Sequence, residues 1–151
     1  STAMQVQFNQ QSRPVLYPVY MSVQPENFNQ NDIITKNLGH MIFASAGILK
    51  KKEKADIEFV PLIETSVSGM QVSTAKLGIF AKPEELMRDY MPQGKLIIAA
   101  RISGKLKSAY SGQPASEGDK DKPESGTDKS YLAETKEPAH IIVVADADFF
   151  T

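Results

Sequence analysis

The stretch of sequence that decides the fold lies near the C-terminus and reads Pro138-Ala139-His140-Ile141-Ile142-Val143-Val144-Ala145-Asp146-Ala147-Asp148-Phe149-Phe150. The four consecutive β-branched residues from Ile141 to Val144 are typical of a strand buried on both faces, because a strand with one wet face alternates apolar and polar side chains. We therefore predict that this strand is central in its sheet. The chain stops one residue after Phe150, and we expect it to be part of a longer protein.

Two carboxylates follow this strand and form the first candidate site. Asp146 and Asp148 lie at the predicted carboxyl end of the strand, where open α/β sheets usually bind their ligands. Their spacing of two would place both side chains on one face, where carboxylates can hold a cation. No third ligand is evident, so we predict no metal site. The alternative is structural, with one carboxylate capping the next turn and the other facing water.

Hydroxyl groups at the end of another predicted strand form the second candidate site. Thr65 and Ser66 close a strand predicted over residues 57–66, and their hydroxyls and nearby amides could hold an anion or a sugar. An ordinary turn would use the same residue types. We predict no catalytic residue: His40 and His140 lack partners at zinc-site spacing and are expected at strand edges, and no Gly-x-Ser-x-Gly motif occurs.

The composition excludes several classes of protein. The chain has 151 residues, enough for one domain, and its 17 basic and 18 acidic side chains predict no nucleic-acid partner. It has no cysteine, which excludes a disulfide, a thiolate metal site and a cysteine nucleophile. We predict no cofactor, and no apolar run reaches the roughly 20 residues that cross a bilayer. We expect residues 1–13 to be a tag remnant and an irregular N-terminal segment, and residues 14–150 to form a single soluble domain.

The remaining patterns predict an α+β fold with α/β-like character. We expect a mixed, strand-rich central sheet of about five strands with two or three short helices. The predicted elements are an edge strand over 15–23, a short helix over 31–38, a hairpin of strands 40–49 and 57–66, a helix over 83–90, and a strand over 95–106 beside the terminal strand. Residues 111–137 are rich in Ser, Gly, Pro and charged residues, and we expect them to be a disordered insertion.

Three segments in this order carry a resemblance to a known family: Phe59 to Ser66, Ala99 to Tyr110, and Ile142 to Phe149. Together they resemble the extracytoplasmic region of the auxiliary component of gliding-motility-type ABC transporters, the GldG-like family. That family has a "PLL-TS" strand, a strand that leads into "G-hydrophobic-x-S-aromatic", and a closing "VV-GDSDF" strand. This chain departs from the pattern at Ala145, where glycine is usual, and at Ala147, where serine is frequent.

The resemblance implies a soluble domain that is membrane-anchored in the full-length protein and lies at the periplasmic face of the inner membrane. It also implies an ABC-2-type permease and a separate ATPase as partners, and a relation to amidotransferase-like α/β domains. Our first hypothesis is a non-enzymatic accessory domain that binds a partner subunit or an exported substrate. The second is a small-molecule or carbohydrate-binding, enzyme-like domain that uses the Asp146/Asp148 turn together with the Thr65-Ser66 loop.

Overall fold

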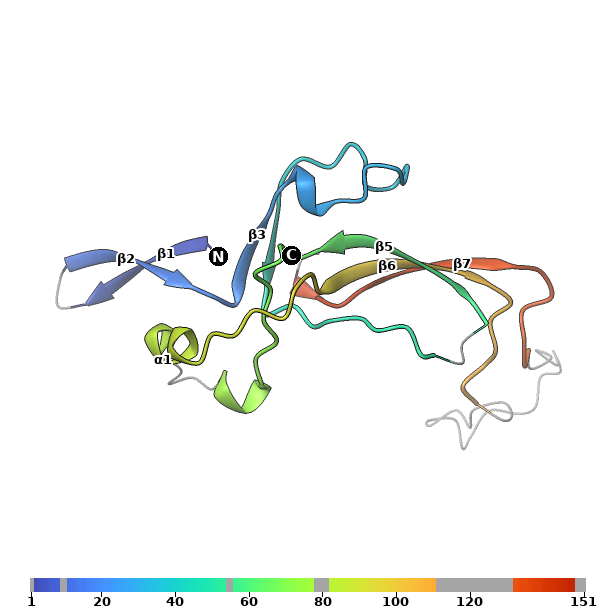
Figure 1. Cartoon of the computed structure of the whole chain (residues 1–151). Coiled ribbons are helices and arrows are strands. Elements are labelled where there is room, and N and C mark those ends of the chain that lie inside the picture. The colour runs from blue at the N-terminus through green and yellow to red at the C-terminus, as the bar shows by residue number, and fades with distance from the viewer. Residues whose placement is uncertain (1, 9–10, 54–55, 78–81, 111–131, 149–151) are drawn as a thin grey trace, which may run out of the picture.

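A computed structural model describes residues 2–8, 11–53, 56–77, 82–110 and 132–148. Most of the regular structure in these ranges is β-strand (Figure 1). The elements in chain order are β1 (Thr2–Phe8), β2 (Gln11–Tyr17), β3 (Tyr20–Val23), the 3-10 helix η1 (Pro25–Asn27), β4 (Met41–Ala44), β5 (Glu58–Glu64), the 3-10 helix η2 (Thr74–Lys76), α1 (Pro83–Arg88), β6 (Ile97–Gly104) and β7 (Ala139–Val144).

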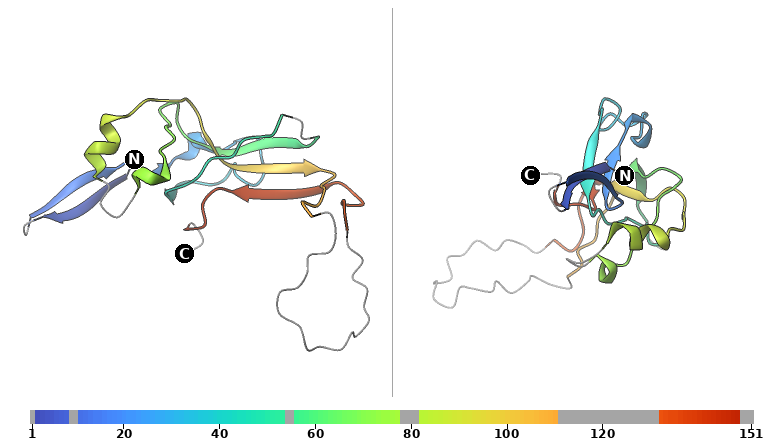
Figure 2. Two further views of the ribbon diagram at one scale, coloured as in Figure 1. Left: turned by 90° about the horizontal axis from the view of Figure 1, so that it is seen from below. Right: turned by 90° about the vertical axis from the view of Figure 1, so that its left-hand side faces the viewer.

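The strands form three antiparallel sheets rather than one. β1 pairs with β2, β3 pairs with β4, and β5, β6 and β7 form a three-stranded sheet in that order. The prediction of a strand-rich fold with few helices is confirmed, whereas the predicted single sheet of about five strands is not found in the described ranges. The β3–β4 pair packs across the three-stranded sheet instead of extending it (Figures 1 and 2).

The central strand of the larger sheet is β6, so the prediction that the terminal strand is central was wrong. Ile98, Ala99 and Ala100 of β6 are at most 1% exposed, whereas Ile141 and Ile142 of β7 are about half exposed. The predicted pairing of the two strands is confirmed. The β-branched run correctly indicated a strand, but within the described chain β6 supplies a neighbour on one side of β7 only.

One apolar cluster joins the β3–β4 sheet to the three-stranded sheet. Phe43 from β4, Leu62 from β5 and Ile98 from β6 are its largest fully buried side chains, and burying each contributes on the order of 2 kcal/mol relative to exposure. Val23 at the end of β3 and Phe28 just after η1 also belong to the cluster. Because β3 and β4 are held by this shared core, the loops at their ends lie against the larger sheet.

The predicted hairpin of residues 40–49 and 57–66 was wrong, although both segments contain strands. β4 pairs with β3, and β5 pairs with β6. The chain after β4 runs across the ends of β6 and β7, where Leu49 N–H donates to Ile97 C=O and Gly47 N–H donates to Ala145 C=O. The connection between β4 and β5 is therefore hydrogen-bonded to β6 and to the residue after β7, and it does not form a hairpin turn.

Other local predictions had mixed outcomes. The helix expected over 83–90 is confirmed as α1, which begins with Pro83 at its first position, where the missing N–H costs nothing. Residues 31–38 form turns rather than a helix, and the segment over 1–13, expected to be irregular, includes β1 and the first residues of β2. The predicted insertion falls largely on residues 111–131, outside the described residues, while Ser108 N–H donates to Ala133 C=O beside that range.

Candidate functional site

The predicted site residues Thr65 and Ser66 follow β5 and form a turn tied to the start of β6. Thr65 N–H donates to Leu96 C=O (2.8 Å), and Leu96 N–H donates to Thr65 Oγ1 (2.9 Å). The Thr65 hydroxyl donates to Ser66 C=O (3.0 Å), and Ser68 N–H donates to Ser66 Oγ (3.3 Å). The hydroxyls of Thr65 and Ser66 thus hold the turn, and a ligand role for them stays a prediction.

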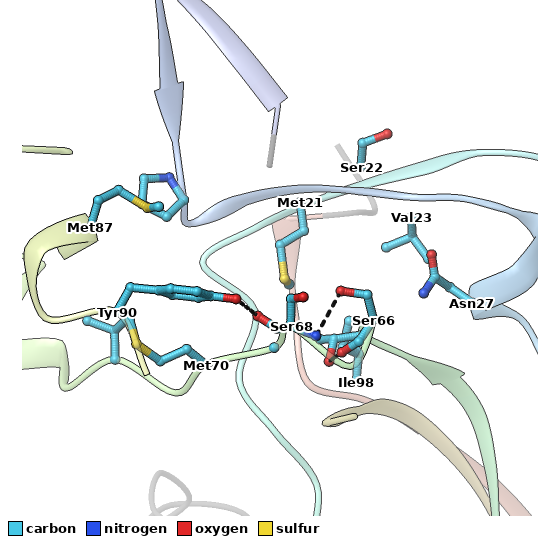
Figure 3. Close-up of a pocket in the computed structure, with 14 residues that line it drawn as sticks. Met21, Ser22, Val23, Asn27, Ser66, Ser68, Met70, Met87, Tyr90 and Ile98 are labelled. Carbon is cyan, nitrogen blue, oxygen red and sulfur yellow. Dashed lines mark hydrogen bonds between the residues drawn. The ribbon is translucent and has the colours of Figure 1, made fainter. Parts of the chain in front are cut away.

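Both residues also line a cavity of about 280 Å³. Its walls come from β3, from the loop over residues 65–72, from α1 and from β6 (Figure 3). The apolar part of the wall consists of Pro18, Met21, Val23, Met70, Val72, Met87 and Ile98. A second cavity of about 200 Å³ shares six lining residues with the first: Pro18, Met21, Thr65, Met70, Val72 and Ile98.

Tyr90 closes one side of the 280 Å³ cavity. Its hydroxyl donates to Ser68 C=O (2.7 Å), which ties the segment after α1 to the loop after β5 (Figure 3). On the same side, Lys76 Nζ lies 2.7 Å from Asp89 Oδ2 and links η2 to the end of α1. The hydrogen bond and charge of Lys76 lower the pKa of Asp89 below its ordinary value.

The cavity is suited to holding apolar groups rather than to acid–base chemistry. Among the described residues, those that line it include no Asp, Glu, His, Lys or Arg. Three of them are methionines, whose flexible thioether side chains adapt to apolar partners of different shapes. Its volume is slightly below the roughly 300–1,000 Å³ of pockets for drug-sized ligands, so it fits an apolar side chain or a short apolar segment.

Asp146 lies after β7 and connects this strand to β4. Ala44 N–H donates to Asp146 Oδ2 (3.0 Å), and Asp148 N–H donates to Asp146 Oδ1 (2.8 Å). Each carboxylate oxygen therefore accepts a backbone hydrogen bond, one within the turn after β7 and one from β4, which is a structural use of this side chain. Asp148 is exposed, and neither aspartate lines the cavity of Thr65 and Ser66. A ligand role for this turn stays a prediction.

A line of polar side chains that the sequence analysis missed crosses one face of the larger sheet. Arg101 Nε donates to Asp32 Oδ2 (3.0 Å), and Arg101 Nη1 donates to Ser103 Oγ (3.2 Å). Ser103 Oγ is in turn hydrogen-bonded to His140 Nδ1 on β7 (2.8 Å). The signal in the sequence was Arg101 itself, because a charge inside an apolar strand requires a partner.

The buried end of this polar line is Asp32, which is 7% exposed. Its pKa is lowered chiefly because Ile34 N–H donates to Oδ1 (3.0 Å), with Arg101 adding a further hydrogen bond and an opposite charge against the cost of burial. Ser103 is also buried. The line joins residues 29–38, β6 and β7 through hydrogen bonds between its members, which indicates a structural role.

Neither histidine has the surroundings of a metal ligand. His40 Nε2 is hydrogen-bonded to Ser22 Oγ (2.7 Å), and His140 belongs to the polar line. Over the described ranges, no three His, Cys, Asp or Glu side chains are grouped closely enough to hold a metal ion. No helix in the same ranges has the length and apolar character needed to cross a bilayer.

Comparison with known proteins identifies the family. Searches of curated proteins and of solved structures found no match. A family model with the description "ABC-type uncharacterized transport system" matches residues 1–151, the whole of this chain. The chain therefore belongs to this family and is an auxiliary component of an ABC-type transport system, as its resemblance to the transporter auxiliary components predicted.

Proposed function

We propose that the chain is a non-enzymatic accessory domain that binds a partner subunit or an exported substrate of a gliding-motility-type ABC transport system. The observation that carries this proposal is the methionine-lined cavity between β3, the loop after β5 and α1. Its apolar, uncharged lining favours recognition of an apolar segment over catalysis, because a catalytic site needs a positioned acid, base or nucleophile.

The rim of the cavity supports a protein as the occupant. Met87 on α1 is 48% exposed and Tyr90 is 37% exposed, although both side chains are largely apolar. Val67, on the adjacent loop, is 68% exposed. Methionine and aromatic residues are enriched in the cores of protein interfaces, where an apolar anchor from the partner fills a pocket.

In this proposal the partners are an ABC-2-type permease and its separate ATPase. The domain lies at the periplasmic face of the inner membrane, where the full-length protein is membrane-anchored, and it contacts the permease or its cargo through the cavity. The family membership supports the transport context. The periplasmic location is tested by fusing alkaline phosphatase to the domain in the full-length protein, since this enzyme is active only after export.

Binding is tested by co-expressing the full-length protein with the permease and ATPase and measuring how much of each is retained on the tagged accessory protein. We expect Met87→Glu to reduce retention by about tenfold or more, because it places a charge where an apolar anchor enters. Ile33→Glu is the matched control, since Ile33 is 78% exposed and does not line the cavity. Undiminished retention by Met87→Glu, or no retention of either partner by the unaltered protein, contradicts the proposal.

A further inference from the structure

The outer edge of β7 presents backbone groups that no described strand satisfies. Ala145 N–H donates to Ile98 C=O (2.9 Å), which sets the phase of the antiparallel ladder between β6 and β7. Hydrogen-bonded and non-hydrogen-bonded pairs alternate in such a ladder, so the N–H and C=O groups of His140, Ile142 and Val144 point away from β6. The close contact of His140 with Ser103 directly opposite agrees, because side chains are nearer in non-hydrogen-bonded pairs.

This edge lacks the features that usually prevent strands from pairing. β7 contains no proline, no lysine and no bulge, and its register with β6 is continuous over six residue pairs. Ile141 and Ile142 project to opposite faces and are 46% and 51% exposed. Both faces of β7 therefore carry exposed apolar side chains next to an edge that no described strand pairs with. Such an edge can pair with another apolar strand.

The sequence of β7 is nearly symmetric about Ile142. An antiparallel copy centred there would place Ile142 opposite itself, Ile141 opposite Val143, His140 opposite Val144 and Ala139 opposite Ala145. Every pair in this register contains at least one aliphatic residue, and none opposes two like charges.

We propose that two copies of this chain associate through antiparallel pairing of their β7 strands about Ile142, forming a continuous six-stranded sheet. His140, Ile142 and Val144 then exchange about six backbone hydrogen bonds across the two-fold axis. The apolar side chains of the two strands then contact one another across the new pair on each face of the sheet, which removes part of their surface from water. The inference is independent of partner binding at the cavity and is tested on the purified chain alone.

The register is tested by introducing single cysteines, which the absence of native cysteine makes unambiguous. Ile142 lies opposite its own copy in a hydrogen-bonded pair with a Cα separation of about 5.5 Å, inside the range for a disulfide. Ile141 lies diagonal to its own copy at about 7–8 Å, outside that range. We expect Ile142→Cys to form a covalent dimer under mild oxidation and Ile141→Cys to form little. Equal cross-linking of both variants, or none by Ile142→Cys, overturns the proposed register.

The association itself is tested by sedimentation velocity over a range of concentrations. The unaltered chain is expected to pass from monomer to dimer, and Ile142→Lys is expected to raise the dissociation constant by about tenfold or more, since two lysines would meet on the axis. Ile33→Lys is the matched control and leaves dimerisation unchanged, and circular dichroism checks the fold of each variant. A chain that stays monomeric throughout, or an equally dimeric Ile142→Lys, overturns the proposal.

Discussion

The two outer strands of the three-stranded sheet are protected in different ways. On the outer side of β5, Phe28 forms a bridge with Ile63, and Asn29 N–H donates to Leu62 C=O (2.9 Å). Pro61 has no N–H to expose, and the register with β6 is irregular from Pro61 onward. On the outer side of β7, the described chain provides no such cover and the ladder with β6 is unbroken.

The difference between the outer edges of β5 and β7 agrees with the difference between their sequences. β5 carries glutamate at both ends and a proline, which suits a strand that ends a sheet. β7 carries the most continuous β-branched run of the chain, which suits a strand between two others. The sequence of β7 is therefore typical of a strand that is buried on both faces and paired at both edges. Within the described chain, β6 pairs with one edge only. Four predictions test this comparison.

The largest expected loss of stability comes from removing Phe28, which covers the outer edge of β5. Phe28 is 3% exposed and belongs to the core cluster, so Phe28→Ala is expected to lower the free energy of unfolding by about 3–5 kcal/mol through lost burial and a residual cavity. Urea denaturation measures it. Ile33→Ala, at an exposed position of the adjacent loop, is expected to change the free energy by less than about 0.5 kcal/mol. Similar losses in both variants would show that β5 is not protected in this way.

The next effect concerns the end of β7. Asp146→Ala removes the acceptor for Ala44 N–H and for Asp148 N–H, and we expect a loss of about 1–3 kcal/mol in the free energy of unfolding. Asp148→Ala retains the backbone N–H that donates to Asp146 and is expected to cost less. Urea denaturation of the two variants side by side checks the order. A larger loss for Asp148→Ala would contradict the structural role of Asp146.

A smaller effect, which is present at neutral pH and lost in acid, tests the loop that covers β5. The pKa of Asp32 is lowered in the folded protein, so its carboxylate stabilises the fold above the ordinary value of 3.8, and this contribution is lost as the pH falls through the lowered pKa. We expect Asp32→Asn to lower Tm at neutral pH and the difference from the unaltered chain to narrow below pH 3.8. Thermal melting across this range measures it, with Glu26→Gln as an exposed control. A difference that is constant with pH would exclude this electrostatic role.

The smallest expected effect on the free energy of unfolding comes from an Ile→Val substitution, made once in the central strand β6 and once in the edge strand β7. Ile98→Val removes one methylene at a position that is 1% exposed, and we expect a loss of about 0.5–1.5 kcal/mol. Ile142→Val makes the same change at a half-exposed position and is expected to cost less than about 0.5 kcal/mol. Urea denaturation at low protein concentration, where the monomer predominates, checks both. Equal costs would mean that β7 is as buried as β6.

Strong local patterns predicted the elements of this fold but not their pairing. The helix at Pro83, the strand over residues 95–106 and its pairing with the terminal strand were predicted correctly, since capping and apolar runs act within a few residues. The pairing of β4 with β3, and the turns at residues 31–38, were not. Strand partners depend on contacts between distant residues, which a single sequence does not reveal.

The sequence selected two residues of the cavity wall, and their role as a site stays a prediction. Thr65 and Ser66 were selected for their hydroxyls, and they line the cavity beside Met70. The methionines of the cavity, Met21, Met70 and Met87, come from three separate segments, so no local sequence motif predicted that they lie together. Likewise, Asp32 and Arg101 are 69 positions apart, and only the fold brings them to 3.0 Å.

The sequence by itself determined the family, the main strands and the absence of cysteine chemistry, because composition, motifs and short-range periodicity are properties of the chain alone. Only the tertiary structure decided that β6 is central, that Asp146 holds β4 to β7, and that three methionines share one cavity. These outcomes depend on packing two sheets around Phe43, Leu62 and Ile98. Burial depends on how the whole chain packs. An apolar run therefore predicts that a strand is buried, but it does not predict which strands pair with it.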